Sequence, residues 1–253
     1  MTTELTYRNK LVIEGGGTGV QNRILGIAGR KGSGKSTLNR EILQHANRLF
    51  IFDTMGEHSW VPDQFKNLDE AYMYILGAGA GDENFVGSFI PEDAQKDALE
   101  SSFAEISNAV YEVGNMSFAV EELPMLSTPQ YNPPSYDRMI RLGRHRAINL
   151  GYTAQRLSEV PRRVTAATDI FVLFSHTEPR DLDAIAERTM PEVARQVSDL
   201  GDHEFLVYDV ASRRLLIVDP EWYDCVLKID SQWTPAVGGK NGRPALWSLD
   251  DAD

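Results

Sequence analysis

Short apolar runs alternate with polar segments of helical spacing between about residue 23 and residue 218. Each run is short enough for a buried strand, and a loop rich in glycine, proline or acidic residues follows it. A strand buried on both faces is apolar along its whole length, so these runs predict a mostly parallel central sheet flanked by helices. The predicted strands are residues 23–28, 49–52, 84–90, 117–120, 148–154 and 170–174.

Helical spacing of apolar residues predicts the segments that cover this sheet. The longest pattern runs over residues 92–113, and Gly114 with Asn115 supplies its stop. Further on, a polar turn separates two apolar runs at residues 204–209 and 214–218, which predicts a C-terminal hairpin. Shorter helices are predicted at residues 38–48, 68–76 and 136–144.

The chain divides into three predicted parts. Residues 1–22 hold a short strand at 10–14 and a glycine-rich lead-in, residues 23–230 form one α/β domain, and residues 231–253 form an extended acidic tail. No apolar run approaches the roughly 18 residues that a transmembrane segment needs, and the start has no signal-peptide pattern. The single cysteine, Cys225, cannot form an intrachain disulfide. We therefore expect a soluble, intracellular protein.

A glycine-rich segment between the first strand and the first helix carries the strongest chemical signal. Residues 29–36, GRKGSGKS, match G-x-x-x-x-G-K-[ST] at every fixed position. Backbone N–H groups of such a turn, together with the helix N-terminus, bind phosphate, while Lys35 reaches the β/γ-phosphates and the Ser36 hydroxyl ligates Mg²⁺. ATP and Mg²⁺ are therefore the predicted cofactors. The predicted nucleotide-binding set is Gly29, Gly32, Ser33, Gly34, Lys35, Ser36 and Thr37.

Two acids, Glu121 and Glu122, follow the predicted strand at 117–120. This position suits one carboxylate that organises Mg²⁺ and a second that polarises the attacking water. The first acid is usually Asp, so the extra methylene of Glu121 brings its carboxylate closer to the metal or requires a water-mediated contact. Paired glutamates after a strand are also a common start of a solvated loop. The phosphate loop upstream favours the catalytic interpretation.

Three further segments resemble signatures of the HerA–FtsK superfamily. Residues 52–58, FDTMGEH, resemble its Asp-x-x-Gly-Glu-Tyr signature. Residues 143–145 (GRH) and 153–156 (TAQR) resemble its Gly-Arg-(Lys/His) and Thr-Gln-Arg segments. The resemblance covers roughly residues 26–185 and is strongest to the small genome-packaging ATPases of membrane-containing viruses. It implies a RecA-like P-loop NTPase fold and a ring-forming ATPase that pumps double-stranded DNA.

The resemblance also implies roles for single residues. Glu121 would be the metal-side acid, Glu122 the catalytic base and Gln155 a γ-phosphate sensor. Arg144 would be a finger that completes a neighbouring subunit's site, where a guanidinium stabilises transition-state charge. Other roles stay open: Arg144 is equally a favourable cation at a helix end. Gln155 could instead hydrogen-bond backbone groups, and Asp53 to Glu57 could form an ordinary acidic turn.

Charge restricts how the chain can meet DNA. A net charge of -12 excludes a uniformly basic DNA-coating surface, but not a motor that grips DNA in a channel. Seven arginines and one acid, Glu159, lie between Arg138 and Arg163. These arginines suit contact with DNA phosphates, with the ATP site or with another subunit. A basic face that contacts only solvent is an equally good interpretation.

The leading interpretation is an ATP-hydrolysing double-stranded DNA translocase of viral genome packaging. The expected partners are DNA of any sequence, a pentameric or hexameric ring of identical subunits, and a capsid vertex or membrane-bound docking protein. We expect it in the host cytoplasm or at a virion vertex. One alternative is a small-molecule, nucleotide-type kinase. The placement of Glu122 and Gln155 argues against it, because these residues suit attack by water. A second is an ATP-dependent assembly module that does not translocate DNA.

Overall fold

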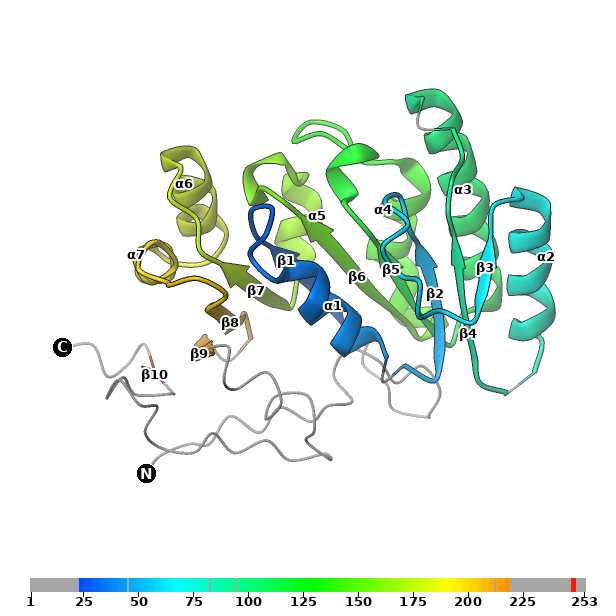
Figure 1. The fold of residues 1–253 in the computed structure, drawn as a ribbon, viewed down its shortest axis with the longest axis horizontal. Coiled ribbons are helices and arrows are strands. Elements are labelled where there is room, and N and C mark those ends of the chain that lie inside the picture. Colours follow the sequence, from blue (N-terminus) through cyan, green and yellow to red (C-terminus); the bar gives the residue numbers. More distant parts are fainter. Residues whose placement is uncertain are drawn as a thin grey trace.

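A single large sheet organises the protein. The computed structural model describes residues 23–44, 46–81, 83–93, 95–211, 213–218 and 247–248. Their ten-stranded sheet has the order β10-β9-β8-β7-β1-β6-β5-β2-β4-β3 (Figure 1). The strands are β1 (Ile24–Ala28), β2 (Arg48–Phe52), β3 (Asp63–Phe65), β4 (Phe85–Phe89), β5 (Met116–Val120), β6 (Ile148–Ala154), β7 (Ile170–Phe174), β8 (Phe205–Asp209), β9 (Arg214–Val218) and β10 (Trp247–Ser248).

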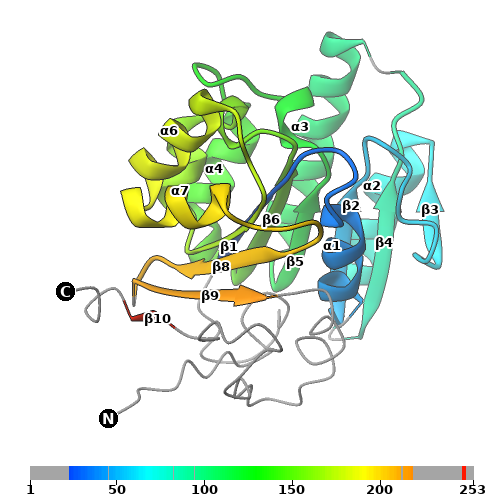
Figure 2. The ribbon, with the colours of Figure 1, turned by 60° about the vertical axis from the view of Figure 1, so that its left-hand side comes forward.

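The type of strand pairing changes once across the sheet, at β7. From β7 to β3 every neighbouring pair is parallel. From β7 to β10 every pair is antiparallel, and Figure 2 shows β8 and β9 side by side as a hairpin. The predicted parallel sheet and C-terminal hairpin are both confirmed. β6 lies between β1 and β5, which brings the ends of these three strands together.

The helices cover the two faces of the sheet unequally. Phe50 and Phe52 of β2 belong to a large core cluster to which α3, α4 and α7 also contribute. Leu49 and Ile51, which point to the other face, belong to a smaller cluster with Leu43 of α1. Figure 1 shows α1 in front of the sheet and α3 and α4 behind it. The helices are α1 (Lys35–Leu43), α2 (Leu68–Gly79), α3 (Lys96–Val113), η2 (Leu123–Met125), α4 (Pro134–Leu142), η3 (Gly143–Arg146), η4 (Leu157–Glu159), α5 (Arg162–Ala167), α6 (Pro179–Arg188) and α7 (Pro191–Ser198).

Some predicted helix bounds were wrong. The helix predicted at 38–48 begins at Lys35 and ends at Leu43. Arg48 instead opens β2, and its guanidinium donates to the carbonyl oxygens of Asn115, Gly81 and Glu83 at 2.7–2.8 Å. These tertiary contacts override the local helical spacing. The helix predicted from residue 92 begins at Lys96, whereas its stop at Gly114 (φ 66°) is confirmed.

Several elements were not predicted, namely β3, α5, α6 and α7. α6 and α7 begin with Pro179 and Pro191, as α4 begins with Pro134. Proline at the first helical position lacks an N–H that would be unpaired there anyway, so these prolines were a usable start signal.

Part of the predicted organisation lies outside the described residues. This applies to the strand at 10–14, the glycine-rich lead-in and most of the tail. Within the tail, Trp247–Ser248 pairs antiparallel with β9. In the described part of the chain, no helix is long and apolar enough to cross a membrane.

Gly26 sets how closely β1 and β6 pack beneath the phosphate loop. A Cβ added there would lie 2.3 Å from the hydroxyl of Tyr152, a buried side chain that also hydrogen-bonds Thr168. We expect Gly26→Ala to lower the free energy of unfolding by about 1–3 kcal/mol, the usual cost of overpacking. Gly77→Ala, at an exposed position of α2 where an added Cβ meets nothing within 4 Å, is the control and should be neutral or stabilising. Urea unfolding measures both, and an unchanged midpoint for Gly26→Ala would contradict the expectation.

Candidate active site

The predicted site residues gather at one edge of the sheet, where its parallel strands end. β1 leads into the phosphate loop (residues 29–36), β6 into Gln155, β5 into Glu121 and Glu122, and β2 into Asp53. Because β1, β6, β5 and β2 are consecutive neighbours, these groups face a common space. Ligand sites of open parallel sheets lie at this edge.

The phosphate loop owes its path to its glycines. Gly32 and Gly34 have φ of 81° and 98°, a left-handed region that favours glycine. Gly29 has no room for a side chain, since an added Cβ would lie 2.6 Å from Ser33 Oγ and 2.8 Å from Phe174 Cβ. α1 begins directly after Gly34, so its free N-terminal N–H groups are available to an anion.

A cavity of about 490 Å³ opens beside this loop. It brings together the predicted residues Gly32, Gly34, Lys35, Ser36, Thr37, Glu121, Glu122 and Gln155. Arg30, Lys31, Met55, Glu57 and His203 complete its lining. Ser33 instead lines a neighbouring cavity of about 250 Å³ on the β7 side of the loop. The volume of the larger cavity is in the range of small-molecule sites.

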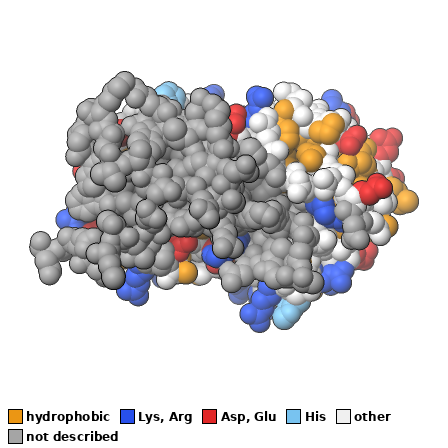
Figure 3. All heavy atoms as spheres, turned by 90° about the horizontal axis from the view of Figure 1, so that it is seen from below, with side chains coloured by type: hydrophobic (Ala, Val, Ile, Leu, Met, Phe, Trp, Pro, Cys, Tyr) orange, Lys and Arg blue, Asp and Glu red, His pale blue; other side chains and the backbone are white. Residues whose placement is uncertain are grey.

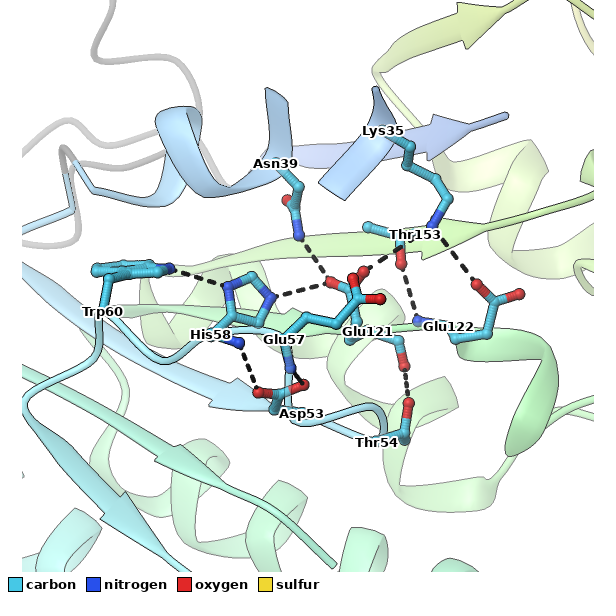
Figure 4. Close-up of polar contacts among 10 residues, drawn as sticks. All are labelled: Lys35, Asn39, Asp53, Thr54, Glu57, His58, Trp60, Glu121, Glu122 and Thr153. Atoms are coloured by element: carbon cyan, nitrogen blue, oxygen red, sulfur yellow. Dashed lines mark hydrogen bonds and ion pairs between the residues drawn. The ribbon is translucent and has the colours of Figure 1, made fainter. Parts of the chain in front are cut away.

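Lys35 lies between the two acids (Figure 4). Its Nζ is 3.5 Å from Glu122 Oε2 and 3.9 Å from Glu121 Oε1. All three side chains are largely buried, so the lysine balances charges that water reaches poorly. The structure thus places both acids beside the lysine of the phosphate loop.

Glu121 is held more tightly than any other acid of the cavity lining. Its Oε2 accepts from Asn39 Nδ2 at 2.8 Å and lies 3.1 Å from His58 Nε2. Its side chain is only 2% exposed. Burial by itself would raise its pKa, but the His58 hydrogen bond and the nearby charge of Lys35 together lower the pKa below its usual value. Glu121 is therefore an ionised, oriented carboxylate.

Glu122 has a different environment. Its backbone is left-handed (φ 52°, ψ 60°), a costly conformation for a residue with a side chain. The Thr153 hydroxyl accepts its N–H at 2.8 Å, and its Oε1 accepts the backbone N–H of Gln155 at 3.1 Å. Burial raises the pKa of Glu122 despite the opposing charge of Lys35. A raised pKa makes this carboxylate the better proton acceptor of the pair.

The segment after β2 forms a turn, and Asp53 holds it. The buried Asp53 carboxylate accepts the backbone N–H groups of Glu57 and His58 at 3.1 and 3.0 Å. Asp53 is therefore structural, whereas Glu57 and Met55 from the same turn line the cavity. The turn also delivers His58 to Glu121 (Figure 4).

The two residues at the ends of β6 differ in position. Gln155 follows the strand and lines the cavity. Arg144 lies in η3 before the strand and is exposed. β6 has seven residues, about 20 Å at the rise of a strand, so Arg144 does not reach the cavity of its own subunit.

Most arginines of the basic stretch already have contacts within the subunit. Arg156 pairs with Asp181, and Arg162 pairs with Glu187. Asp137 bridges Arg141 and Arg163, each at about 3 Å. Arg138 and Arg146 lie over or beside Tyr111. Most exposed pairs of this kind are weak, so such arginines can still exchange partners.

The donor set beside the loop fits Mg²⁺. Glu121 and Ser36 line the same cavity and offer the oxygen ligands that Mg²⁺ prefers. Among the described residues no cluster of three or more His, Cys, Asp or Glu could hold a metal alone. Mg²⁺ typically takes one or two protein ligands and completes its shell with phosphate and water. A site with only Glu121 and Ser36 as protein ligands is therefore consistent with Mg²⁺ bound together with a nucleotide.

Sequence reasoning missed the residues that position Glu121. Asn39 is four residues after Lys35 on α1, hence on the same helix face, and that spacing was a usable signal. His58 ends the segment at residues 52–58 that resembles a HerA–FtsK signature, but nothing in the sequence linked it or Trp60 to Glu121. The contact of His58 with Glu121 depends on how the turn after β2 lies against the end of β5.

Solved structures share this fold. The genome packaging NTPase B204 of Sulfolobus turreted icosahedral virus 2, in complex with ATP-γ-S, aligns at TM-score 0.65 and 23% identity over 78% of this chain and 97% of that one. The DNA-packaging ATPase B204 of Sulfolobus turreted icosahedral virus aligns at 0.63 and 21% identity, over 79% and 98%. VirB4 of Thermoanaerobacter pseudethanolicus aligns at 0.56 and 13% identity, over 83% and 96%.

At these identities the likeness concerns the fold, and it confirms the predicted α/β P-loop NTPase fold. No protein-family model matches the sequence, and no curated protein sequence matches it.

Proposed function

We propose that this chain is an ATPase that couples ATP hydrolysis to movement of double-stranded DNA, as in viral genome packaging. The observation that carries the hydrolytic part is the arrangement of Lys35, Glu121, Glu122 and Gln155 around one cavity beside a phosphate loop. The packaging part is supported by the HerA–FtsK-like segments and by the fold shared with B204.

Each group has a distinct task in this proposal. The triphosphate lies along the loop and the start of α1, and Lys35 turns from the acids to its β/γ-oxygens. Ser36 and Glu121 would hold Mg²⁺, which when bound neutralises charge on the same oxygens. Glu122, freed from Lys35, accepts a proton from the attacking water, and Gln155 contacts the γ-phosphate.

The kinase alternative is less well supported. A kinase activates a hydroxyl of a second substrate, which needs its own pocket beside the γ-phosphate. Here that position is lined by Glu122, Gln155 and Glu57, groups that suit a small, polar nucleophile such as water.

DNA contact needs a local basic surface, because the chain as a whole is acidic. On the face seen in Figure 3, the lysine and arginine side chains of the described part are scattered among acidic ones. A channel formed by several subunits would concentrate such charges. Arg162 and Arg163, the exposed first residues of α5, are our candidates for this channel.

Double-stranded DNA is expected to stimulate ATP hydrolysis by the assembled protein to a similar extent whatever its sequence, because phosphate contacts carry no base information. Stimulation should weaken steeply as the salt concentration rises, because the release of counterions from DNA then contributes less to the free energy of binding. ATPase rates with and without DNA, measured beside the oligomeric state, test this. An assembled protein without DNA binding or stimulation at low salt would favour the assembly module, and one that stays monomeric with ATP would favour the kinase.

The double variant Arg162→Ala/Arg163→Ala should need several-fold more DNA for half-maximal stimulation and show a shallower salt dependence. Lys66→Ala/Arg195→Ala removes two exposed, ion-paired cations elsewhere and is the charge-matched control. Equal losses in both variants would mean that net charge matters and that α5 does not contact DNA.

A further inference from the structure

We propose that His58, held by Trp60, is a positioning residue that binds one carboxylate oxygen of Glu121 and so leaves the other oxygen for the metal. The inference rests on the proposed role of Glu121 as the metal-side acid. It concerns a chain of contacts, Trp60–His58–Glu121, in which His58 and Glu121 are buried and Trp60 is half-buried (Figure 4).

Trp60 and Glu121, which flank the ring, determine which nitrogen of His58 carries the proton. The Trp60 indole N–H lies 3.1 Å from His58 Nδ1 and can only donate. Nδ1 is therefore the acceptor, and in the neutral ring the proton is on Nε2. Nε2 faces Glu121 Oε2 at 3.1 Å and donates to it.

The backbone of His58 is fixed as firmly as its ring. Its N–H donates to Asp53, and its carbonyl oxygen accepts from the Gln64 amide at 2.9 Å and from the backbone N–H of Val61 at 3.0 Å. The His58 side chain is only 2% exposed. His58 therefore has little freedom to swing away from Glu121.

The two oxygens of Glu121 consequently have different surroundings. Oε2 accepts from both His58 and Asn39, whereas Oε1 faces Lys35 at 3.9 Å. The Thr153 hydroxyl is a further hydrogen-bond partner of this carboxylate. When Lys35 turns to phosphate, Oε1 loses its cationic neighbour and is the oxygen left to ligate a metal in the cavity that Ser36 also lines. The longer glutamate side chain, which has one more rotatable bond than the usual aspartate, is thereby held in one orientation.

The test is the Mg²⁺ dependence of nucleotide binding, measured on the full chain by calorimetry with the non-hydrolysable analogue AMPPCP. His58→Leu should bind metal-free AMPPCP like the unaltered protein. It should need at least about tenfold more Mg²⁺ to reach half of the Mg²⁺-dependent increase in AMPPCP affinity. This is the usual cost of losing a residue that hydrogen-bonds a metal ligand. His58→Gln should recover most of that loss, because an amide can donate to Glu121 and accept from Trp60. Asn108→Leu, which replaces an exposed polar side chain on α3, is the control.

A further variant and a spectroscopic measurement make every outcome decisive. If Glu121→Gln leaves the Mg²⁺ dependence unchanged, the metal-side role of Glu121 itself fails. If Glu121→Gln weakens it and a folded His58→Leu does not, only the positioning role fails. Should His58→Leu not fold, nitrogen NMR of the His58 ring decides. The unaltered protein must show the Nε2–H form, and an Nδ1–H ring overturns the proposal.

Discussion

Replacing Glu122 by Gln is expected to slow ATP hydrolysis by about 10²-fold or more while ATP stays bound, because the amide cannot accept the proton of the attacking water. The substitution is mild for the fold. An amide oxygen can still accept the backbone N–H of Gln155, the contact that Glu122 Oε1 makes at 3.1 Å. Single-turnover hydrolysis, read beside ATP affinity, separates the loss of chemistry from a loss of binding.

The control for this variant is Glu105→Gln, an exposed glutamate on α3 away from the cavity. It should hydrolyse ATP at the unaltered rate. If Glu122→Gln does so too, Glu122 is not the base, and Glu121 becomes the next candidate. The structure makes Glu121 the weaker base, since its pKa is lowered while that of Glu122 is raised.

The central sheet could be predicted from sequence because its strands are buried on both faces. β6 and β7 were predicted residue for residue at 148–154 and 170–174. β7, IFVLF, is a continuous apolar run, and β6, INLGYTA, is a buried run with polar segments on both sides. β3 shows the opposite case, because three residues at the edge of the sheet, Asp63–Phe65, have no apolar period to detect.

The site was predictable where chemistry demands a contiguous motif. Residues 29–36 must be adjacent because one loop cradles the phosphates, so the motif is visible in sequence. Glu121 and Glu122 were visible because strand ends converge at one edge of a parallel sheet. Asn39, His58 and Trp60 act through contacts between separate elements, and a single sequence does not show which turn crosses which strand.

Arg144→Ala is expected to reduce hydrolysis by about 10³-fold or more without loss of ATP binding, if Arg144 completes a neighbouring subunit's site. Its position at the far end of β6 excludes a role in the cavity of its own subunit. An exposed arginine at that edge can act only across an interface. Arg141→Ala, which removes an exposed arginine from the same end of α4, is the control and should retain hydrolysis measured without DNA.

Mixing two inactive variants separates the shared-site model from a structural effect. Lys35→Ala removes the β/γ-phosphate contact but keeps Arg144, whereas Arg144→Ala keeps Lys35. In a mixed ring some intact Lys35 sites face an intact Arg144, so part of the hydrolysis should return. An arginine that merely stabilises its own subunit gives no such rescue, because each variant keeps its own defect. Mixed rings that form, as shown by differential tagging, and remain inactive would therefore exclude Arg144 as the finger and leave it as a solvated cation beside β6.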